Sequence, residues 1–313
     1  MNRPRTTSIV LGTRGSDLAK AQTQLVIDAL KARWAGLKIE TKVITTRGDN
    51  AETALGDARA GRKGLFTGEI ERALVGREID LAVHSAKDLP SALVPGTEIF
   101  AALARASVQD VLVATTPCDL DSLMPDGIVA TGSVRRKHQL HWKRPDVEIV
   151  ELHGNVPTRL RKLANDEWHG IILARAGLER LGLNPTEHAV TFEGREFSVA
   201  ILPREIFLPA GGQGIVAVQA RSDDEQLREL ADGINDFDTR LCLRAEREFL
   251  RLLHGDCNQP VGVLASIEGP IMKISAQVFD YGATTPRQGF VEGPAADAER
   301  LAAQLMPQIN GEK

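Results

Sequence analysis

Short apolar segments alternate with segments of helical periodicity along most of this chain, and this alternation restricts the possible folds more than any other feature. The predicted strands are Ser8–Gly12, Leu37–Thr46, Ile79–Val83, Gly127–Ala130, Val147–Leu152 and Gly170–Ala174. The predicted helices are Asp17–Trp34, a segment that ends near Gly76, Val134–Trp142, Val156–Ala164 and Ala176–Leu181. Strands that alternate with helices form mostly parallel sheets covered by helices. The first part of the chain is therefore predicted to be α/β.

The pattern changes after about residue 224. Residues 190–215 are rich in Gly and Pro and are interpreted as a crossing region. The elements predicted after them are helices at 224–232 and 238–253, strands at 260–267, 271–280 and 287–292, and a helix near 294–305. They form an α+β module. The openings TRGS and TGSVRR are alike, which makes two similar α/β domains plausible before this module.

Composition narrows the class of protein. The chain has 313 residues and a formal net charge of −4, which argues against a general nucleic-acid binder. At about 150 residues per domain, roughly two domains are expected, with one large or three small ones as alternatives. No apolar run approaches the roughly 20 residues of a membrane span, and the start lacks the apolar stretch of a signal peptide. With only three scattered cysteines and no metal-like His spacing, we expect a cytoplasmic protein without a metal.

Two junctions between a strand and a helix carry residues that suit an anion. At the first, TRGS, backbone N–H groups at a helix N-terminus, the Ser16 hydroxyl and the Arg14 charge can hold an anion, although helix capping alone explains Gly and Ser equally well. At the second, residues 131–137, Arg135 and Arg136 project about 100° apart on one helical turn. One of the two arginines is therefore expected to face the junction.

Basic residues are concentrated in one stretch of the chain. Residues 131–162 hold eight Lys or Arg against three Asp or Glu, a local net charge of +5. A solvated basic face is the simpler interpretation of such a run. However, Arg159 again follows a predicted strand end, and open α/β sheets bind ligands in a crevice at the carboxyl ends of their strands.

The sequence HSAKDLP follows the apolar strand IDLAV and so also lies at a strand end. A carboxylate beside a lysine usually forms only an ion pair. In a cleft that holds several arginines, however, Asp88 would stay ionised and could stabilise a cation or move a proton. His84 is expected to be a packed or hydrogen-bonded histidine rather than a ligand.

One cysteine stands in a turn rather than in a helix. Cys257, in GDCNQP, is better placed for exposure than Cys242, which lies in the helical run LCLRAEREFL. An inert thiol is the simpler interpretation. Covalent attachment of another group is one functional use of such a loop thiol.

Taken together, these residues make the chain resemble the porphobilinogen deaminase family, also called hydroxymethylbilane synthases, from about residue 8 to 305. The matching stretches are TRGSDLAKAQ (13–22), TRGD (46–49), GRKGLFTGEIE (61–71), DLAVHSAKDLP (80–90), TGSVRRKHQL (131–140), HGNVPTRL (153–160), IILARAGLERLGL (171–183), LPAGGQG (208–214) and GDCNQP (255–260). Each stretch alone is a modest match, and their shared order and spacing carry the resemblance.

The resemblance implies two periplasmic-binding-protein-like (type II) α/β domains with a cleft between them, and a small α+β domain. The expected boundaries are 1–103 with 203–222, 104–202, and 223–313. The resemblance also implies a transferase of haem biosynthesis, monomeric as family members typically are. It would condense porphobilinogen head to tail, release ammonia and yield linear hydroxymethylbilane, primed by a dipyrromethane cofactor on a loop cysteine.

The family's functional residues are carried over to the positions that match its motifs. Cys257 would hold dipyrromethane through a thioether, and Asp88 would be the catalytic carboxylate, handling pyrrole N–H groups and the cation left by loss of ammonia. The residues expected to bind cofactor and chain carboxylates, or to lie beside them, are Lys87, Ser133, Arg135, Arg136, Arg159, Thr131 and Ser85. The residues expected to bind substrate, or to line its cleft, are Arg14, Ser16, His153, Gly154, Arg180, Gln22 and Lys63.

One position departs from the family pattern. The family has Arg before Gly-Asn-Val, whereas this chain has His153, which has fewer donors and no fixed charge. Weaker substrate binding is expected, and a protonated His153 would make activity fall as the pH rises. The departure also keeps an alternative open: a paralogue, or a non-catalytic binding or sensor protein for a small anionic ligand on the same fold.

Overall fold

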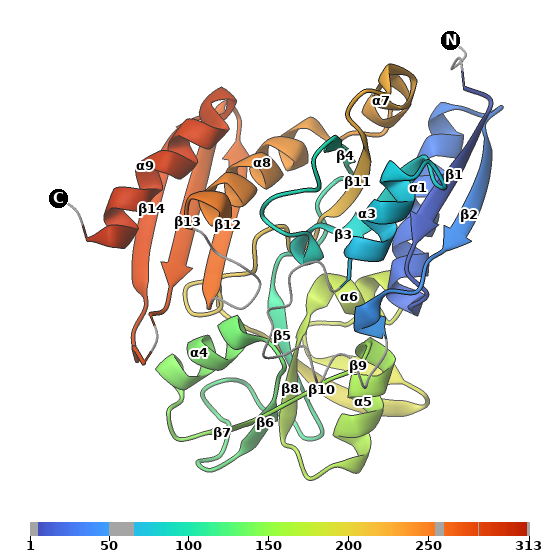
Figure 1. The fold of residues 1–313 in the computed structure, drawn as a ribbon. Helices are drawn as coiled ribbons and strands as arrows, with labels where there is room; N and C mark the ends of the chain where they lie inside the picture. Colours follow the sequence, from blue (N-terminus) through green and yellow to red (C-terminus); the bar gives the residue numbers. More distant parts are fainter. Residues whose placement is uncertain (1–5, 50–65, 254–259, 281, 312–313) are drawn as a thin grey trace.

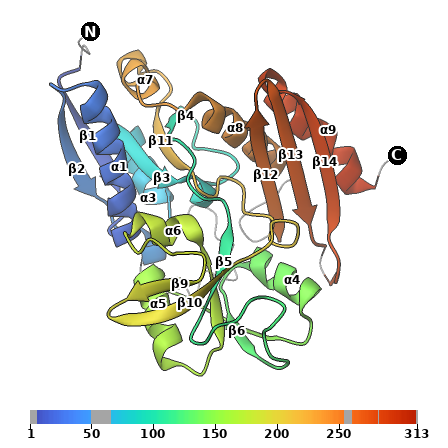
Figure 2. The same ribbon diagram turned by 180° about the vertical axis from the view of Figure 1, so that it is seen from behind.

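The computed structural model describes residues 6–49, 66–253, 260–280 and 282–311. Its strands form a five-stranded, a six-stranded and a three-stranded sheet, each with helices packed against it (Figure 1). The view from behind shows the three-stranded sheet beside the five-stranded one and the six-stranded sheet below both (Figure 2). The predicted fold class, two α/β domains and a small α+β domain, is confirmed.

The five-stranded sheet has the order β2-β1-β3-β11-β4. Its strands are β1 (Ser8–Thr13), β2 (Lys38–Val43), β3 (Leu81–Ser85), β4 (Thr97–Ala102) and β11 (Val216–Arg221), and its helices are α1 (Asp17–Arg33) and α3 (Gly68–Val75). Only β11 runs against the other four, so the sheet is mostly parallel in strand direction. Its core includes Leu11, Val26, Leu81 and Val218, all fully buried. Each such side chain contributes about 1.5–3 kcal/mol to folding.

The six-stranded sheet has the order β7-β6-β8-β5-β10-β9. Its strands are β5 (Asp110–Ala114), β6 (Ile128–Ala130), β7 (Glu148–Val150), β8 (Gly170–Ala174), β9 (Ala189–Phe192) and β10 (Arg195–Ile201), and its helices are α4 (Val134–Lys143), α5 (Val156–Asn165) and α6 (Arg175–Arg180). Strands β6, β7, β8 and β10 run one way, and β5 and β9 run the other. The carboxyl ends of β6 and β8 therefore lie at the same edge, where α4 and α6 begin.

The three-stranded sheet is antiparallel throughout and consists of β12 (Val261–Glu268), β13 (Ile271–Val278) and β14 (Arg287–Pro294). Helices α8 (Phe237–Leu252) and α9 (Ala298–Asn310) cover one face of it, while the shorter α7 (Glu225–Asp232) packs near β4 and β11 (Figures 1 and 2). Alternate residues of the strands, among them Val263, Ala265 and Ile274, form a core with α8 and α9. This is the predicted α+β module, except that the helix predicted at 224–232 is α7, whose Leu227 and Leu230 pack in the core of the five-stranded sheet.

Five strands were not predicted: β4, β5, β9, β10 and β11. Strands β5 and β11 are buried along their whole length, so their sequences show no alternation of polar and apolar residues. Strands β9 and β10 form a hairpin around Glu193 and Gly194, both at positive φ (49° and 76°), as a two-residue hairpin turn requires. The predicted crossing region is thus only partly right, because its first part is this hairpin.

Residues 202–215, called the return segment below, lie between β10 and β11. They bring the chain back to the five-stranded sheet, where β11 pairs with both β3 and β4. Gly212 lies in this return segment at a φ of 76°. A Cβ atom there would lie 2.9 Å from the backbone of Ala86 and Lys87, so only glycine allows the segment to pack this closely. The return segment is thereby held against the turn that follows β3.

Candidate functional site

Serine hydroxyls cap the helices at both junctions that were predicted to bind an anion. The Ser16 hydroxyl accepts a hydrogen bond from the Ala19 N–H at 3.3 Å, and the Ser133 hydroxyl accepts one from the Arg136 N–H at 3.4 Å. Capping of α1 and α4 therefore accounts for both serines.

A small cavity of about 80 Å³ lies between the two α/β domains. It is lined from the five-stranded sheet side by Leu18, Gln22, Ser85 and Lys87, from the six-stranded side by Arg136, Val156, Arg159, Leu173, Ala174, Ala176, Gly177 and Arg180, and by the return segment at Gly212, Gly214 and Ile215. Six residues expected in the site from the sequence line it: Gln22, Ser85, Lys87, Arg136, Arg159 and Arg180. These residues come from segments far apart in the sequence, so the fold brings them together.

The cavity is strongly basic. Lys87, Arg136, Arg159 and Arg180 line it, and the described residues that line it include no Asp or Glu. Burial lowers the pKa of Lys87 to about 8, assisted by the charge of Arg136, while Asp88 and Asp110 oppose the shift. Burial also lowers the pKa of Arg180 to about 10. Such an environment favours a ligand that carries carboxylates, because each carboxylate relieves repulsion among the cations.

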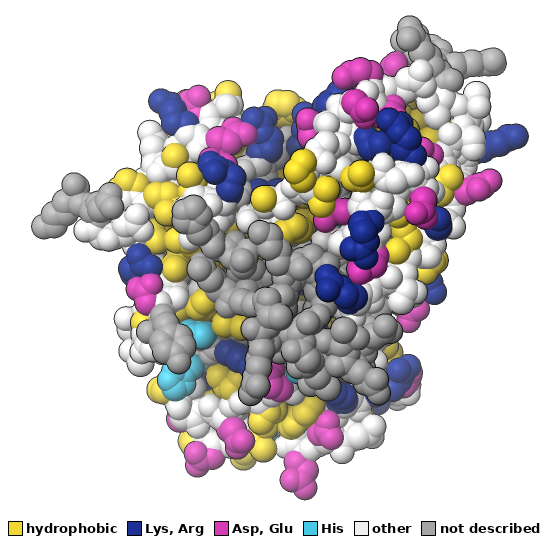
Figure 3. Space-filling view, viewed as in Figure 1, with side chains coloured by type: hydrophobic (Ala, Val, Ile, Leu, Met, Phe, Trp, Pro, Cys, Tyr) yellow, Lys and Arg dark blue, Asp and Glu magenta, His cyan; other side chains and the backbone are white. Residues whose placement is uncertain are grey.

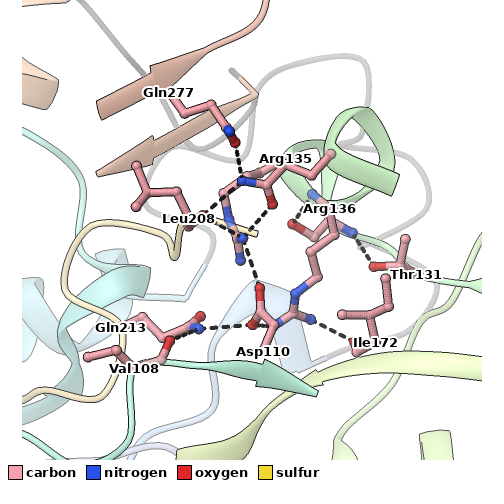
Figure 4. Close-up of polar contacts among 11 residues, drawn as sticks. Val108, Asp110, Thr131, Arg135, Arg136, Ile172, Leu208, Gln213 and Gln277 are labelled. Atoms are coloured by element: carbon pink, nitrogen blue, oxygen red, sulfur yellow. Dashed lines mark hydrogen bonds and ion pairs between the residues drawn. The ribbon is translucent and has the colours of Figure 1, made fainter. Parts of the chain in front are cut away.

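Arg135 and Arg136, adjacent on the first turn of α4, are both about 5% exposed. They share the fully buried Asp110, the first residue of β5 (Figure 4). Arg135 Nη1 lies 2.8 Å from Asp110 Oδ2, and Arg136 Nη2 lies 2.7 Å from Asp110 Oδ1. Burial would raise the pKa of Asp110, but the two guanidinium groups outweigh it and hold that pKa well below its usual range. Asp110 is therefore a permanent counterion of the pair.

Backbone carbonyls and amide side chains fix the other ends of this network (Figure 4). Arg136 Nη1 donates to the carbonyl oxygen of Ile172 at 2.7 Å, and Arg135 Nη1 donates to that of Leu208 at 2.9 Å. Gln213 Nε2 donates to Asp110 Oδ1 at 2.9 Å. The six-stranded sheet and the return segment thus meet at one buried carboxylate.

Gln22 and Ser85 link α1 to the end of β3. Gln22 Nε2 donates to Ser85 Oγ at 2.8 Å, and the Ser85 hydroxyl donates to Gln22 Oε1 at 3.0 Å. Since both residues line the cavity, this pair sets the shape of its wall on the five-stranded side.

Asp88, Arg14 and six other expected residues that the structure describes do not line the cavity. Asp88 ends a 3-10 turn, Ala86–Asp88, and is partly buried beside Lys87. The Arg14 guanidinium lies 4.3 Å from the centre of the Phe66 ring. The other expected residues away from the cavity lining are Ser16, Thr131, Ser133, Arg135, His153 and Gly154. They surround the cavity rather than form its wall.

His153 is 42% exposed, and its Nε2 lies 3.8 Å from an oxygen of Glu151. Glu151 is also ion-paired with Lys137. Gly154, which follows, has a φ of 115°, and a Cβ there would lie 2.8 Å from the Thr158 side chain. The loop conformation therefore requires Gly154, whereas the identity of residue 153 is not imposed by packing.

Two expected residues, Cys257 and Lys63, lie outside the described residues. The two cysteines that the structure describes are free. Burial raises the pKa of the Cys242 thiol to about 12, and burial also raises that of Cys118. Both thiols are therefore held in their unreactive, protonated form.

His84 is 5% exposed, and burial lowers its pKa to about 4, so it is a neutral core residue as predicted. Sequence reasoning missed Asp110, Gln139 and Gln213. The signal for Asp110 was a carboxylate directly before the apolar run VLVA, a polar residue at the start of a buried strand. The described residues contain no group of His, Cys, Asp and Glu side chains that could hold a metal ion.

Comparisons with known proteins bear on this arrangement. Residues 9–229 match the family model "Porphobilinogen deaminase, dipyromethane cofactor binding domain", and residues 240–310 match "Porphobilinogen deaminase, C-terminal domain". The chain belongs to the porphobilinogen deaminase family. Its relatives include the porphobilinogen deaminases of Roseiflexus sp. (strain RS-1), 41% identical over 96% of this chain and 95% of that one, and of Syntrophobacter fumaroxidans (strain DSM 10017 / MPOB), 42% identical over 95% of this chain and 92% of that one.

Membership of the porphobilinogen deaminase family confirms several expectations. The chain is a transferase, a hydroxymethylbilane synthase of tetrapyrrole biosynthesis, and contains a dipyrromethane-binding domain.

Solved structures that resemble it include the periplasmic VFT2 domain of Bordetella pertussis BvgS, with a TM-score of 0.41 and 15% identity over 73% of this chain and 86% of that one. None of the described helices is long and apolar enough to cross a membrane.

Proposed function

We propose that the basic cavity is where this porphobilinogen deaminase holds the carboxylates of its dipyrromethane cofactor and of porphobilinogen. The observation that carries the proposal is the convergence of Lys87, Arg136, Arg159 and Arg180 on one cavity without an acidic residue among its described lining. Each added pyrrole brings two carboxylates, so the ligand gains negative charge as the chain grows. Arginine matches a carboxylate with two parallel hydrogen bonds.

Two buried hydrogen-bond donors of cavity residues suit a ligand that carries carboxylates. Nε of Arg136 and Nε of Arg180 are buried and make no hydrogen bond to the described residues. A buried charged donor without a partner is costly, and a carboxylate in the cavity would satisfy it. Ser85 and Gln22 supply further polar groups at the wall. The residues present therefore fit dipyrromethane and its carboxylates.

Asp88 is the proposed catalytic residue. It directly follows Lys87, which lines the cavity, and belongs to the same 3-10 turn, Ala86–Asp88. Each condensation breaks the bond between the aminomethyl carbon and nitrogen of porphobilinogen and joins that carbon to a pyrrole carbon. Asp88 stabilises the positive charge that develops on the substrate and carries the proton lost by the pyrrole to the departing ammonia. When bound, dipyrromethane supplies the first pyrrole carbon to be extended.

Cys257 is the proposed attachment residue for dipyrromethane. The pKa values of the other two thiols, Cys118 and Cys242, are raised by burial, which makes them poor nucleophiles. The proposed thioether therefore falls on the cysteine of the GDCNQP motif.

The intact mass of the purified protein tests the attachment. We expect the wild-type chain, expressed in a haem-making host, to carry a dipyrromethane adduct that Cys257→Ala lacks. Cys118→Ala and Cys242→Ala are the matched controls and should keep the adduct. An unmodified wild-type protein, or an adduct that survives in Cys257→Ala, would contradict the proposal.

Porphobilinogen consumption tests the role of Asp88. Asp88→Ala should fold normally but consume no measurable porphobilinogen, whereas Asp119→Ala, which removes an exposed loop carboxylate of the six-stranded domain, should behave as wild type. Normal turnover by Asp88→Ala would rule out the assigned role.

The remaining expectations are proposals about the whole chain. The boundaries 1–103 with 203–222, 104–202 and 223–313 are supported by β11, which returns to the five-stranded sheet. A monomeric cytoplasmic enzyme is proposed from the resemblance to the family, and the absence of nucleic acid is supported by the net charge of −4 and by acidic and basic side chains that are interspersed on the face in Figure 3. Light scattering at several concentrations tests the monomer.

A further inference from the structure

Two adjacent arginines that are both buried need an explanation. Arg135 and Arg136 are each about 5% exposed, and two cations so close in a medium of low dielectric repel one another. Burial itself lowers the pKa of Arg135. The pair is stable only because a buried anion lies between the two guanidinium groups. That anion is Asp110, whose two oxygens each pair with a different arginine at 2.8 and 2.7 Å.

Asp110 is itself held firmly. It begins β5, which lies inside the six-stranded sheet between β8 and β10, and its backbone carbonyl accepts the Leu202 N–H at 3.0 Å. Gln213 Nε2 bonds to its Oδ1 and also to the carbonyl oxygen of Val108 at 2.7 Å. The carboxylate therefore cannot follow the arginines if they move. It acts as a fixed point for them.

The ion pairs leave part of each guanidinium group available. Arg136 uses Nη2 for Asp110 and Nη1 for Ile172, while its Nε, buried at the cavity wall, makes no hydrogen bond to the described residues. A guanidinium has five N–H donors, so donors remain for a ligand carboxylate. Asp110 and Ile172 thus use the two Nη atoms of Arg136 and leave its Nε for a ligand.

We propose that Asp110 is a positioning residue of this enzyme: by pairing with Arg135 and Arg136 through opposite oxygens, it orients Arg136, the arginine of the pair that lines the cavity, toward the carboxylates of dipyrromethane. The inference rests on the proposed function of the cavity. Charge alone predicts the opposite result from positioning. Removal of a negative charge makes the site more cationic and would strengthen carboxylate binding, whereas the loss of a fixed partner leaves the arginines misdirected and weakens it.

The test compares Asp110→Asn and Asp110→Ala with a matched control on the same helix. Arg144, which ends α4, pairs with Asp146 at 2.8 Å (Nε to Oδ1) and 2.7 Å (Nη2 to Oδ2), so Asp146→Ala also removes a carboxylate from an arginine, but away from the cavity. Each protein is purified from a haem-making host, its adduct-bearing fraction is measured by intact mass, and its porphobilinogen turnover is measured.

We expect the adduct-bearing fraction or the turnover of both Asp110 variants to fall about 10- to 100-fold, the range seen when a residue that orients a ligand-binding group is lost. Asp146→Ala should stay within about twofold of wild type, since exposed pairs contribute little. Loading and turnover of the Asp110 variants at or above the wild-type level would overturn the proposal. A failure of wild type itself to load and turn over would instead overturn the proposed function.

Chemical rescue separates positioning from folding. Asp110→Ala leaves space for a small carboxylate between the two arginines, so sodium formate should restore turnover in a saturable manner, whereas sodium chloride at equal ionic strength should not. Asp110→Glu, which keeps the charge, should retain more turnover than Asp110→Asn. If formate and chloride act alike, or if both Asp110→Ala and Asp110→Asn are insoluble, then Asp110 is a folding requirement and the positioning role is wrong.

Discussion

Two clusters of buried arginine and carboxylate lie near each other but differ in how completely their donors are used. In the first, Arg105 pairs with Glu246 through Nη1–Oε1 at 2.6 Å and Nη2–Oε2 at 3.2 Å, and its Nε donates to the carbonyl oxygen of Gln213. Glu246 also accepts the N–H groups of Gly212 and Ala265. In the second, Asp110 serves Arg135 and Arg136, and Nε of both arginines makes no hydrogen bond to the described residues.

We propose that this difference separates an arginine that stabilises the fold from one that binds a ligand. Arg105 connects the chain between β4 and β5 with α8 and β12, so the Arg105–Glu246 pair joins the small α+β module to the rest of the molecule. Its donors are used within the protein. Arg136 of the second cluster lines a basic cavity, and Nε of both Arg135 and Arg136 makes no hydrogen bond to the described residues. Burial and ion pairing alone do not distinguish the two clusters, whereas the unused donors do.

The largest expected effect comes from breaking the Arg105–Glu246 cluster, in which Nε, Nη1 and Nη2 of the arginine all donate within the protein. Glu246→Ala leaves the Arg105 charge buried without a partner and should lower the free energy of unfolding by about 3–5 kcal/mol. The measurement is denaturant unfolding followed by a probe of the α8 region. Glu248→Ala, also on α8 but paired with the exposed Arg251, is the control and should cost less than about 1 kcal/mol. Equal losses in the two variants would show that burial does not set the contribution.

A substitution in the cluster of Asp110, Arg135 and Arg136 should affect function more than stability. Arg136→Lys keeps a charge at the cavity wall but loses the planar fork, so turnover of porphobilinogen should fall about 100-fold, equivalent to about 2.7 kcal/mol of transition-state stabilisation. Arg161→Lys, which alters an exposed pair with Glu193 in the same domain, should leave turnover unchanged. Full turnover by Arg136→Lys would mean that the unused donors receive no ligand.

The same contrast explains what the sequence could predict. Arg135 and Arg136 were predicted to be unequal because neighbours on a helix point in different directions, and the structure agrees: Arg136 lines the cavity, whereas Arg135 faces Leu208 and Gln139. Their counterion could not be found in this way. Asp110 lies 25 residues upstream, at the start of a strand that shows no periodicity. A pairing between distant segments depends on sheet order, which local patterns do not encode.

The fold shows the same limit. Strands at the start of β-α units, such as β1 and β6, were predicted closely because a helix follows each one. Strands β5 and β11 were missed because they are buried along their whole length and so show no alternation, and β4 was missed because it directly follows a segment with two prolines. The site residues on strand ends were accordingly predictable, while those that fasten the return segment, such as Gln213, were not.

A third, smaller effect is expected from Lys87, which belongs to neither cluster. Lys87 lines the cavity, and burial lowers its pKa to about 8. Below pH 8 its ammonium group can hold a carboxylate, and above pH 8 that interaction is lost. The KM for porphobilinogen should therefore rise about tenfold between pH 7 and 9. Lys87→Arg should remove this dependence because a guanidinium stays charged.

Stability should respond to Lys87 in the opposite direction. Its pKa is about 8 in the folded protein and near 10.4 in an unfolded chain. Between these values the unfolded state binds more protons, so the contribution of Lys87 to stability increases as the pH rises from 8 to 10. Unfolding experiments on wild type and Lys87→Arg check the sign. A KM profile that is the same in both proteins would mean that Lys87 does not hold a substrate carboxylate.

The smallest effect is expected at His153, an exposed residue that belongs to neither cluster. His153 is 42% exposed beside Glu151, which is 57% exposed and already paired with Lys137. His153→Arg adds a permanent charge and a fork of donors at a position where packing does not restrict the side chain. An exposed charge interaction contributes up to about 1 kcal/mol, so kcat/KM for porphobilinogen should rise by no more than about fivefold. The gain should fade at high salt, since exposed charges are screened. An unchanged kcat/KM at low salt would show that residue 153 makes no productive contact with substrate, and that carboxylate binding depends on the cavity wall alone.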